Sequence, residues 1–203
     1  MSQTQSANPR PRPLVVGIGG TTREASSTDR ALRTALKAAE EAGAETHLFG
    51  GPSLARLPHF APENPERTEE QRHFVNTVRR ADGLIVASPG YHGGVSGLVK
   101  NALDLLEDLR GDARPYLDGR AVGCIATAAG WQAAVTTLEA LRAIVHALRG
   151  WPTPFGASLN TAEPIFDAAG SCTDQKARDA LTTVARQVVE FARVHGKRLG
   201  EAS

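Results

Sequence analysis

Short apolar runs alternate with stretches of helical periodicity along most of this chain. The apolar runs predict strands near residues 14–19, 45–49, 83–88, 120–127 and 155–159. Apolar residues spaced three or four apart predict a helix from Ser26 or Ser27 to just before Gly43, and others near 68–80, 98–109, 132–148 and 174–195. This alternation favours βαβ units, whose right-handed crossovers place helices on both faces of a parallel sheet. The sequence therefore predicts a doubly wound α/β fold with a five-stranded parallel sheet.

The size and composition of the chain are those of a single domain. It has 203 residues, of which 41% are hydrophobic, enough for one substantial core. Residues 1–13 are polar and contain three prolines, which predicts a disordered arm. We expect one domain over residues 14–195, followed by a frayed end at 196–203.

Charge and hydropathy exclude several kinds of partner. Lysine and arginine number 23 and aspartate and glutamate 22, so the net charge of +1 predicts no nucleic-acid partner. No apolar run approaches the roughly 18 residues that span a bilayer, and no secretory signal is recognisable. We therefore expect a cytoplasmic protein without a membrane partner. The two cysteines, Cys124 and Cys172, are too few and too far apart to predict a disulfide framework or a metal site.

Three loops of the predicted sheet are expected to form one binding site. In open α/β sheets, ligands bind beyond the carboxyl ends of the strands, which here are followed by loops 19–28, 88–97 and 127–133. The first loop combines several hydroxyls, Arg23 and a helix start, a combination that favours a phosphate group. The second contains three glycines, which allow a flat ligand to approach the backbone.

Two common nucleotide-binding motifs are missing from the sequence. A dinucleotide fingerprint that begins at Gly17 would need a glycine where Thr22 stands, and no acidic residue follows the second predicted strand, which ends at Phe49 and Gly50. No Walker A motif occurs either. A Rossmann dehydrogenase and a nucleoside triphosphatase are both disfavoured.

Two motifs carry a family resemblance. The first is Gly19-Gly20-Thr21-Thr22-Arg23 followed by Ser26; the second is Ser88-Pro89-Gly90-Tyr91-His92-Gly93-Gly94 with Gly97-Leu98-Val99-Lys100-Asn101-Ala102-Leu103-Asp104. Together they resemble the NADPH-dependent FMN reductase family, which has the flavodoxin-like fold, and the likeness extends from Leu14 to about Val194.

The resemblance implies that FMN is bound and reduced by hydride from NADPH or NADH. It assigns the FMN phosphate to Thr21, Arg23, Ser26 and Thr28. It places the isoalloxazine ring along Pro89, Gly90, Tyr91, His92 and Gly93, and completes the pocket with Thr127, Gly130 and Trp131. No catalytic side chain and no metal are expected, because the cofactor carries the chemistry.

The resemblance also implies a homodimer or homotetramer and a small electron acceptor or free flavin as substrate. A flavin-dependent monooxygenase would be one consumer of released reduced flavin. If FMN instead stays bound, a quinone, azo or nitro compound would enter at the same face. A flavodoxin-type electron carrier is a further alternative, although such carriers are acidic and lack the arginine in the phosphate loop. A flavin-fold protein that has lost catalysis is the remaining one.

Two features of the sequence bear on which substrate is used, and neither identifies it. Trp131 stands in a segment, 128–133, that is more glycine-rich in many family members, and it would alter access to the flavin ring. The proline-rich connection 50–65 is long enough to serve a function. It would either close over a partner's pocket or pack between subunits.

Overall fold

A single parallel sheet organises the computed structural model, which describes residues 12–200 and the side chains of 12–195. The sheet runs in the order β2-β1-β3-β5, and β6 and β7 both pair with the outer edge of β5. The bounds of these strands are β1 (Leu14–Gly19), β2 (Glu45–Phe49), β3 (Gly83–Tyr91), β5 (Ala121–Ala128), β6 (Trp151–Pro152) and β7 (Ala157–Asn160). This is the flavodoxin-like order, in which the first strand lies between the second and third. The predicted fold class is confirmed.

Within residues 12–200 the sheet has seven strands, where five were predicted. The predicted fifth strand, near 155–159, corresponds to β7, and β6 is an additional two-residue strand before it. Residues 153–156, which include Pro154, separate the two. The other addition is β4 (Gly94–Val95), which pairs antiparallel with the end of β3. Both additional strands are two residues long and leave the doubly wound topology unchanged.

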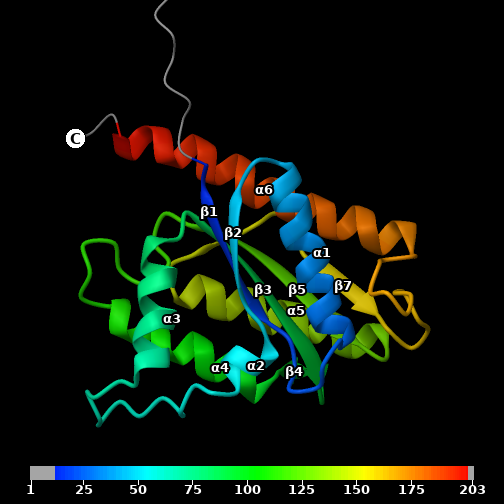
Figure 1. Ribbon diagram of the computed structural model, residues 1–203, viewed down its shortest axis with the longest axis horizontal. Helices are drawn as coiled ribbons and strands as arrows, with labels where there is room; N and C mark the ends of the chain where they lie inside the picture. The colour runs from blue at the N-terminus through cyan, green and yellow to red at the C-terminus, as the bar shows by residue number, and fades with distance from the viewer. Residues whose placement is uncertain (1–11, 201–203) are drawn as a thin grey trace, which may run out of the picture.

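Helices cover both faces of this sheet (Figure 1). One face packs against α1 (Ser27–Glu41) and α6 (Gln175–Gly200). The other packs against α3 (Glu69–Arg80), α4 (Gly97–Asp104) with the 3-10 helix η1 (Leu105–Leu109), and α5 (Trp131–Ala147). All five predicted helices are present, and α6 continues beyond His195 to Gly200. The predicted arm at 1–13 falls largely outside the described residues. Of the predicted frayed end at 196–203, residues 196–200 belong to α6 and the rest lie outside the described residues.

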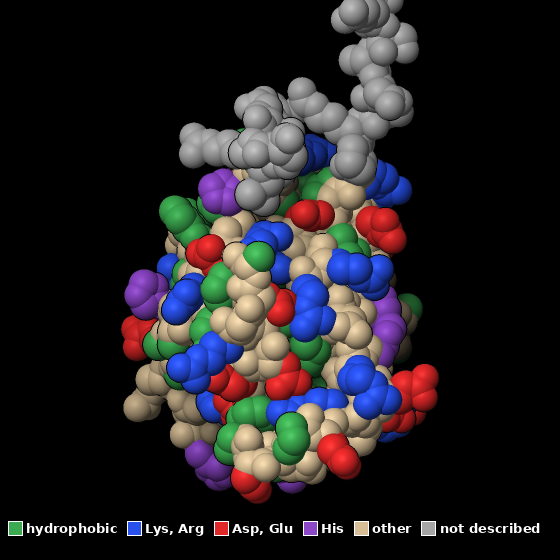
Figure 2. Space-filling view, turned by 90° about the vertical axis from the view of Figure 1, so that its left-hand side faces the viewer, with side chains coloured by type: hydrophobic (Ala, Val, Ile, Leu, Met, Phe, Trp, Pro, Cys, Tyr) green, Lys and Arg blue, Asp and Glu red, His purple; other side chains and the backbone are tan. Residues whose placement is uncertain are grey.

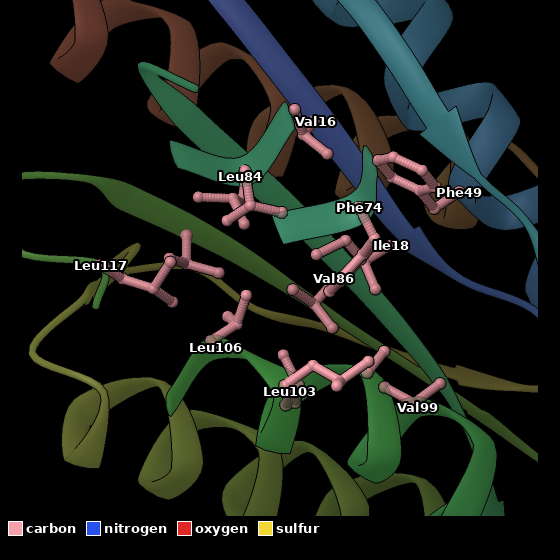
Figure 3. Close-up of a cluster of buried hydrophobic side chains, with 14 of the residues drawn as sticks. Val16, Ile18, Phe49, Phe74, Leu84, Val86, Val99, Leu103, Leu106 and Leu117 are labelled. Atoms are coloured by element: carbon pink, nitrogen blue, oxygen red, sulfur yellow. The ribbon is translucent and has the colours of Figure 1, made fainter. Parts of the chain in front are cut away.

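The core consists of two apolar clusters, one on each face of the sheet. Figure 3 shows part of the first cluster, in which side chains of the sheet such as Leu84 and Val86 meet Phe74, Leu103 and Leu106 from the helices. On the opposite face, Leu32 of α1 and Val184 of α6 are fully buried. Because the central strands are buried on both faces, they read as continuous apolar runs.

The connection after β2 is attached to the chain's own helices. It begins with a short helix, α2 (Gly51–Leu54), that the sequence did not predict. Further along, the backbone N–H of Phe60 donates to Asn101 Oδ1 of α4 at 2.8 Å, and Asn101 Nδ2 donates to Pro58 O at 3.1 Å. Arg67 forms a bidentate ion pair with Asp108 of η1, with both N–O distances at 2.9 Å. These contacts order the connection within one chain.

The surface carries charges of both signs. Figure 2 shows Lys and Arg side chains interspersed with Asp and Glu over the face that it displays. No helix in the described part of the chain has the length and apolar character needed to cross a bilayer.

Candidate functional site

A cavity of about 300 Å³ lies at the carboxyl ends of β1, β3 and β5. All three predicted loops reach it. Its walls are formed by Thr21, Arg23, Ser26, Ser27, Thr28, Pro89, Gly90, Tyr91, His92, Thr127, Ala128, Ala129 and Thr161. Its volume is at the lower end of the range typical of small-molecule sites, roughly 300–1,000 Å³.

Most of the predicted site residues meet in this cavity, and three do not. Those on its wall are Thr21, Arg23, Ser26, Thr28, Pro89, Gly90, Tyr91, His92 and Thr127. Gly93, Gly130 and Trp131 lie outside the wall: Gly93 is in a turn, Gly130 caps α5, and Trp131 begins that helix with 63% of its surface exposed.

Thr161 is the wall residue that sequence reasoning missed. It follows β7 directly, and its backbone N–H donates to Ala128 O at 2.8 Å, which places it beside the loop after β5. The same rule that identified the other loops, a position beyond the carboxyl end of a parallel strand, could have found it.

The first loop brings a helix start to the cavity. Gly19, with φ 152°, leaves β1 so close to β3 that a Cβ there would lie 2.1 Å from Ala87 O. Ser26 then caps α1, since its Oγ accepts from the N–H of Asp29 at 3.2 Å, while its carbonyl accepts from Arg30. The N–H groups of Ser27 and Thr28, in the first turn, stay available for a ligand.

Hydroxyl groups add donors beside this helix start. Ser26 uses its oxygen as an acceptor in the cap, so its own proton is free to donate. Thr28 Oγ1 and Thr127 Oγ1 lie 2.6 Å apart and both side chains are buried. One proton suffices for that bond, so the pair retains one O–H that can donate to a bound group.

The second loop is a β-hairpin, and the third predicted strand therefore extends past Ser88 to Tyr91. Gly90 pairs with Val95 and Tyr91 with Gly94, and the turn residues His92 and Gly93 have φ of 53° and 77°. Positive φ at both positions is the signature of the two-residue turn that best matches strand twist. At its base, the buried Ser88 Oγ accepts from the N–H of Ser96 at 3.0 Å.

The hairpin is also packed directly against α5. A Cβ on Gly90 would lie 2.7 Å from Thr137 Oγ1 and 3.0 Å from Ala133 O. The hydroxyl of Thr137 is buried and has no hydrogen-bond partner among residues 12–195. The side of the cavity formed by Pro89–His92 is thus a firm backbone surface on which a flat ring could rest.

The electrostatics of the cavity favour an anion. Arg23 is exposed and makes no ion pair within the described part of the chain, and no acidic side chain lines the wall. The start of α1 adds the partial positive charge of its backbone dipoles. A phosphate would meet a cation, hydroxyl donors and backbone N–H groups.

A larger groove of about 840 Å³ lies on the other side of α1, beside α6. Its walls carry charges of both signs, and Asp29 pairs there with Arg33 at 2.8 Å. Arg30 Nη1 donates to Asp167 O at 2.8 Å. None of the predicted site residues lines this groove, so the smaller cavity is the better candidate.

Neither cysteine belongs to the cavity. Burial raises the pKa of Cys124 to about 12, and burial likewise raises the pKa of Cys172. Both are free thiols, and the thiolate that would act as a nucleophile is disfavoured at neutral pH. Among the described residues, no group of three or more His, Cys, Asp and Glu could hold a metal ion.

Comparison with known proteins points to one family. A family model described as NADPH-dependent FMN reductase matches residues 13–163. The NADPH-dependent FMN reductase ArsH of Rhizobium meliloti is 26% identical over 180 residues, which cover 89% of this chain and 72% of ArsH. The NAD(P)H-dependent FMN reductase PA1204 of Pseudomonas aeruginosa is 27% identical over 169 residues, 82% of this chain and 88% of PA1204.

A solved structure shows the same fold. FerB of Paracoccus denitrificans, titled a flavoenzyme NAD(P)H:(acceptor) oxidoreductase, superimposes with a TM-score of 0.75 at 21% identity. The match covers 90% of this chain and 98% of FerB.

Proposed function

Since the chain belongs to the NADPH-dependent FMN reductase family, we propose that it transfers hydride from NADPH or NADH to FMN held in the cavity at the carboxyl ends of β1, β3 and β5. Electrons then pass to free flavin or to another small acceptor. Family membership supports an oxidoreductase activity of this general kind.

One observation carries the placement of the cofactor: a single cavity joins an anion site to a firm backbone surface. We assign the FMN phosphate to the first loop, where Arg23, Ser26 and the Thr28–Thr127 hydroxyl pair provide donors. The isoalloxazine ring would lie along Pro89–His92, on the hairpin held by α5. Thr161 also lines the cavity, beside the loop after β5.

The residues of the chain bind and orient the cofactor. Bound FMN would supply the redox chemistry, because its ring accepts hydride from a nicotinamide. We expect backbone groups of the hairpin to hydrogen-bond the ring edge beside Tyr91, which lines the cavity and has 58% of its surface exposed. No acid, base or nucleophile has to be supplied by a side chain.

The activity is tested by following oxidation of NADPH and of NADH in air across a titration of added FMN. A rate that rises with free FMN and saturates identifies a flavin reductase. A rate without added FMN identifies a reductase with bound flavin, whose acceptor would be a quinone, azo or nitro compound. Absence of oxidation in all conditions, with FMN bound, favours a non-catalytic electron carrier.

The phosphate assignment predicts that Arg23→Ala weakens FMN binding roughly 10- to 100-fold but riboflavin binding little. A hydrogen bond to a charged group contributes about 1.5–3 kcal/mol, and only FMN has the phosphate. Dissociation constants follow from quenching of flavin fluorescence. Arg33→Ala is the matched control, because Arg33 is exposed on α1 but does not line the cavity. Equal losses for FMN and riboflavin would disprove the assignment.

We further propose that the FMN-binding domain spans residues 14–195 and forms a homodimer or homotetramer in the cytoplasm. A flavin-dependent monooxygenase is the proposed consumer if reduced FMN is released. Light scattering on the purified protein tests the assembly. Oxygen consumption by such a monooxygenase, with and without a dialysis membrane between the proteins, tests the transfer of free flavin.

A further inference from the structure

Two large aromatic side chains are exposed on segments that form or adjoin the cavity. Tyr91, which is 58% exposed, lines the cavity, and Trp131, which is 63% exposed, comes two positions after the wall residue Ala129. Aromatic residues make up only 5% of the chain. An exposed indole on the segment that follows a binding cavity is a candidate contact for a ligand that enters there.

The other tryptophan has a different environment. Trp151 is 55% exposed but packs against Phe191, with ring centroids 5.4 Å apart, and against His195 at 6.1 Å. Trp131 has no aromatic neighbour of this kind within the described part of the chain. Trp131, 63% exposed, is therefore not held by an aromatic pair as Trp151 is.

Backbone packing joins the segments that carry the two side chains. Gly90, next to Tyr91, lies against Ala133 O, and a Cβ on Gly93 would lie 3.2 Å from Thr136 Oγ1. The hairpin thus packs against the first turns of α5, the helix that Trp131 begins. Gly130 precedes it with φ 149°, and nothing lies within 4 Å of the position that a Cβ would occupy there.

We propose that Trp131 is a specificity-determining residue, whose indole face favours electron acceptors with extended flat aromatic rings over compact acceptors. This inference rests on the proposed function. Stacking between aromatic faces adds to affinity beyond burial of area. A flat acceptor that enters between Trp131 and the flavin ring gains this contact, while a compact inorganic ion does not.

The two acceptor classes can be compared with menadione, a flat quinone, and ferricyanide, a compact ion. Reduction of menadione consumes the hydride of NADPH and one proton from water, and yields the hydroquinone. Two ferricyanide ions each take one electron, and one proton is released. We expect Trp131→Ala to lower the ratio of kcat/KM for menadione to that for ferricyanide by about five- to tenfold.

Two further variants make this comparison decisive. Trp131→Phe should restore most of the ratio, because it keeps an aromatic face, and Trp151→Ala should leave the ratio at the wild-type value. An unchanged ratio in Trp131→Ala, or an equal fall in Trp151→Ala, would overturn the inference. If the wild type shows no FMN-dependent oxidation with ferricyanide either, the proposed function fails instead.

Binding can be measured without turnover. Trp151→Phe leaves Trp131 as the only tryptophan of the chain. With FMN present and NADPH absent, menadione should then quench the Trp131 emission along a saturating curve. Quenching that rises linearly with menadione, as collisions alone produce, would refute stacking at Trp131 whatever the kinetic result.

Discussion

At the scale of single residues, Gly90 shows how closely the hairpin approaches α5. A side chain at this position would meet Thr137 Oγ1 at 2.7 Å, Ala133 O at 3.0 Å and Ala128 Cβ at 3.1 Å. Two of these neighbours are a backbone oxygen and the Cβ of a short side chain, which cannot rotate away. The absence of a Cβ thus allows the cavity wall to rest on the helix.

Gly90→Ala should therefore destabilise the protein by about 1–3 kcal/mol, the usual cost of overpacking, and weaken FMN binding as the wall is displaced. Urea unfolding and flavin fluorescence measure the two effects. Gly97→Ala is the control: it begins α4, no atom lies within 4 Å of its Cβ position, and alanine favours a helix. If both variants behave alike, contact with α5 is not what requires glycine at position 90.

At the scale of elements, Arg120 joins the end of α3 to the start of β5. Its side chain is buried and donates to three backbone carbonyls: to Ala81 O at 2.9 Å, to Tyr116 O at 2.8 Å and to Arg79 O at 2.7 Å. Burial, and then the neighbouring Arg114, lower the pKa of Arg120 to about 10, so it is still charged at neutral pH. A cation at the carboxyl end of a helix is favourably placed.

Arg120→Met should lower the free energy of unfolding by roughly 3 kcal/mol, because it leaves carbonyl groups in a buried place without donors. The loss should appear in urea unfolding without a change in FMN affinity, since Arg120 lies at the opposite end of the sheet from the cavity. Arg110→Met serves as the control, because the Arg110 side chain is 75% exposed and makes one ion pair, with Glu107 at 3.4 Å. If Arg120→Met leaves the free energy of unfolding unchanged, water molecules replace the lost donors.

At the scale of the whole molecule, His47 makes folding stability depend on pH. It lies on the edge strand β2, with its ring centroid 4.6 Å from that of Phe49 and 5.8 Å from that of His73. Partial burial, followed by the charges of His73 and Arg80, lowers the pKa of His47 below its ordinary value of 6.5. In the acid range the unfolded chain therefore binds more protons at this position than the folded protein does.

It follows that the contribution of His47 to stability is fully present above pH 6.5 and decreases as the pH falls through that value, until the folded form is protonated as well. His47→Gln should flatten the decline in unfolding free energy between about pH 7.5 and about pH 5.5. His59→Gln, on the exposed part of the connection after β2, controls for loss of a histidine. An equal decline in wild type and His47→Gln would rule out this origin.

Several features of the fold could be predicted because they depend on local pattern. Buried central strands require apolar runs and amphipathic helices require a repeat near 3.6, so both are readable one segment at a time. The two-residue strand β6 was not readable in this way, because its pairing depends on which residues of 151–160 can reach β5. The short helix α2 was not predicted either, because four residues are too few to show a helical periodicity.

The sequence by itself determined the doubly wound fold and the three loops that meet at one end of the sheet, since parallel βαβ topology places those loops together whatever their side chains. The tertiary structure alone decided which residues face the cavity. It turned residues 90–95 into a hairpin against α5, brought Thr161 to the wall, and left Gly93, Gly130 and Trp131 outside it. The direction of a side chain depends on backbone angles and on packing between distant segments, and neither is encoded in a local pattern.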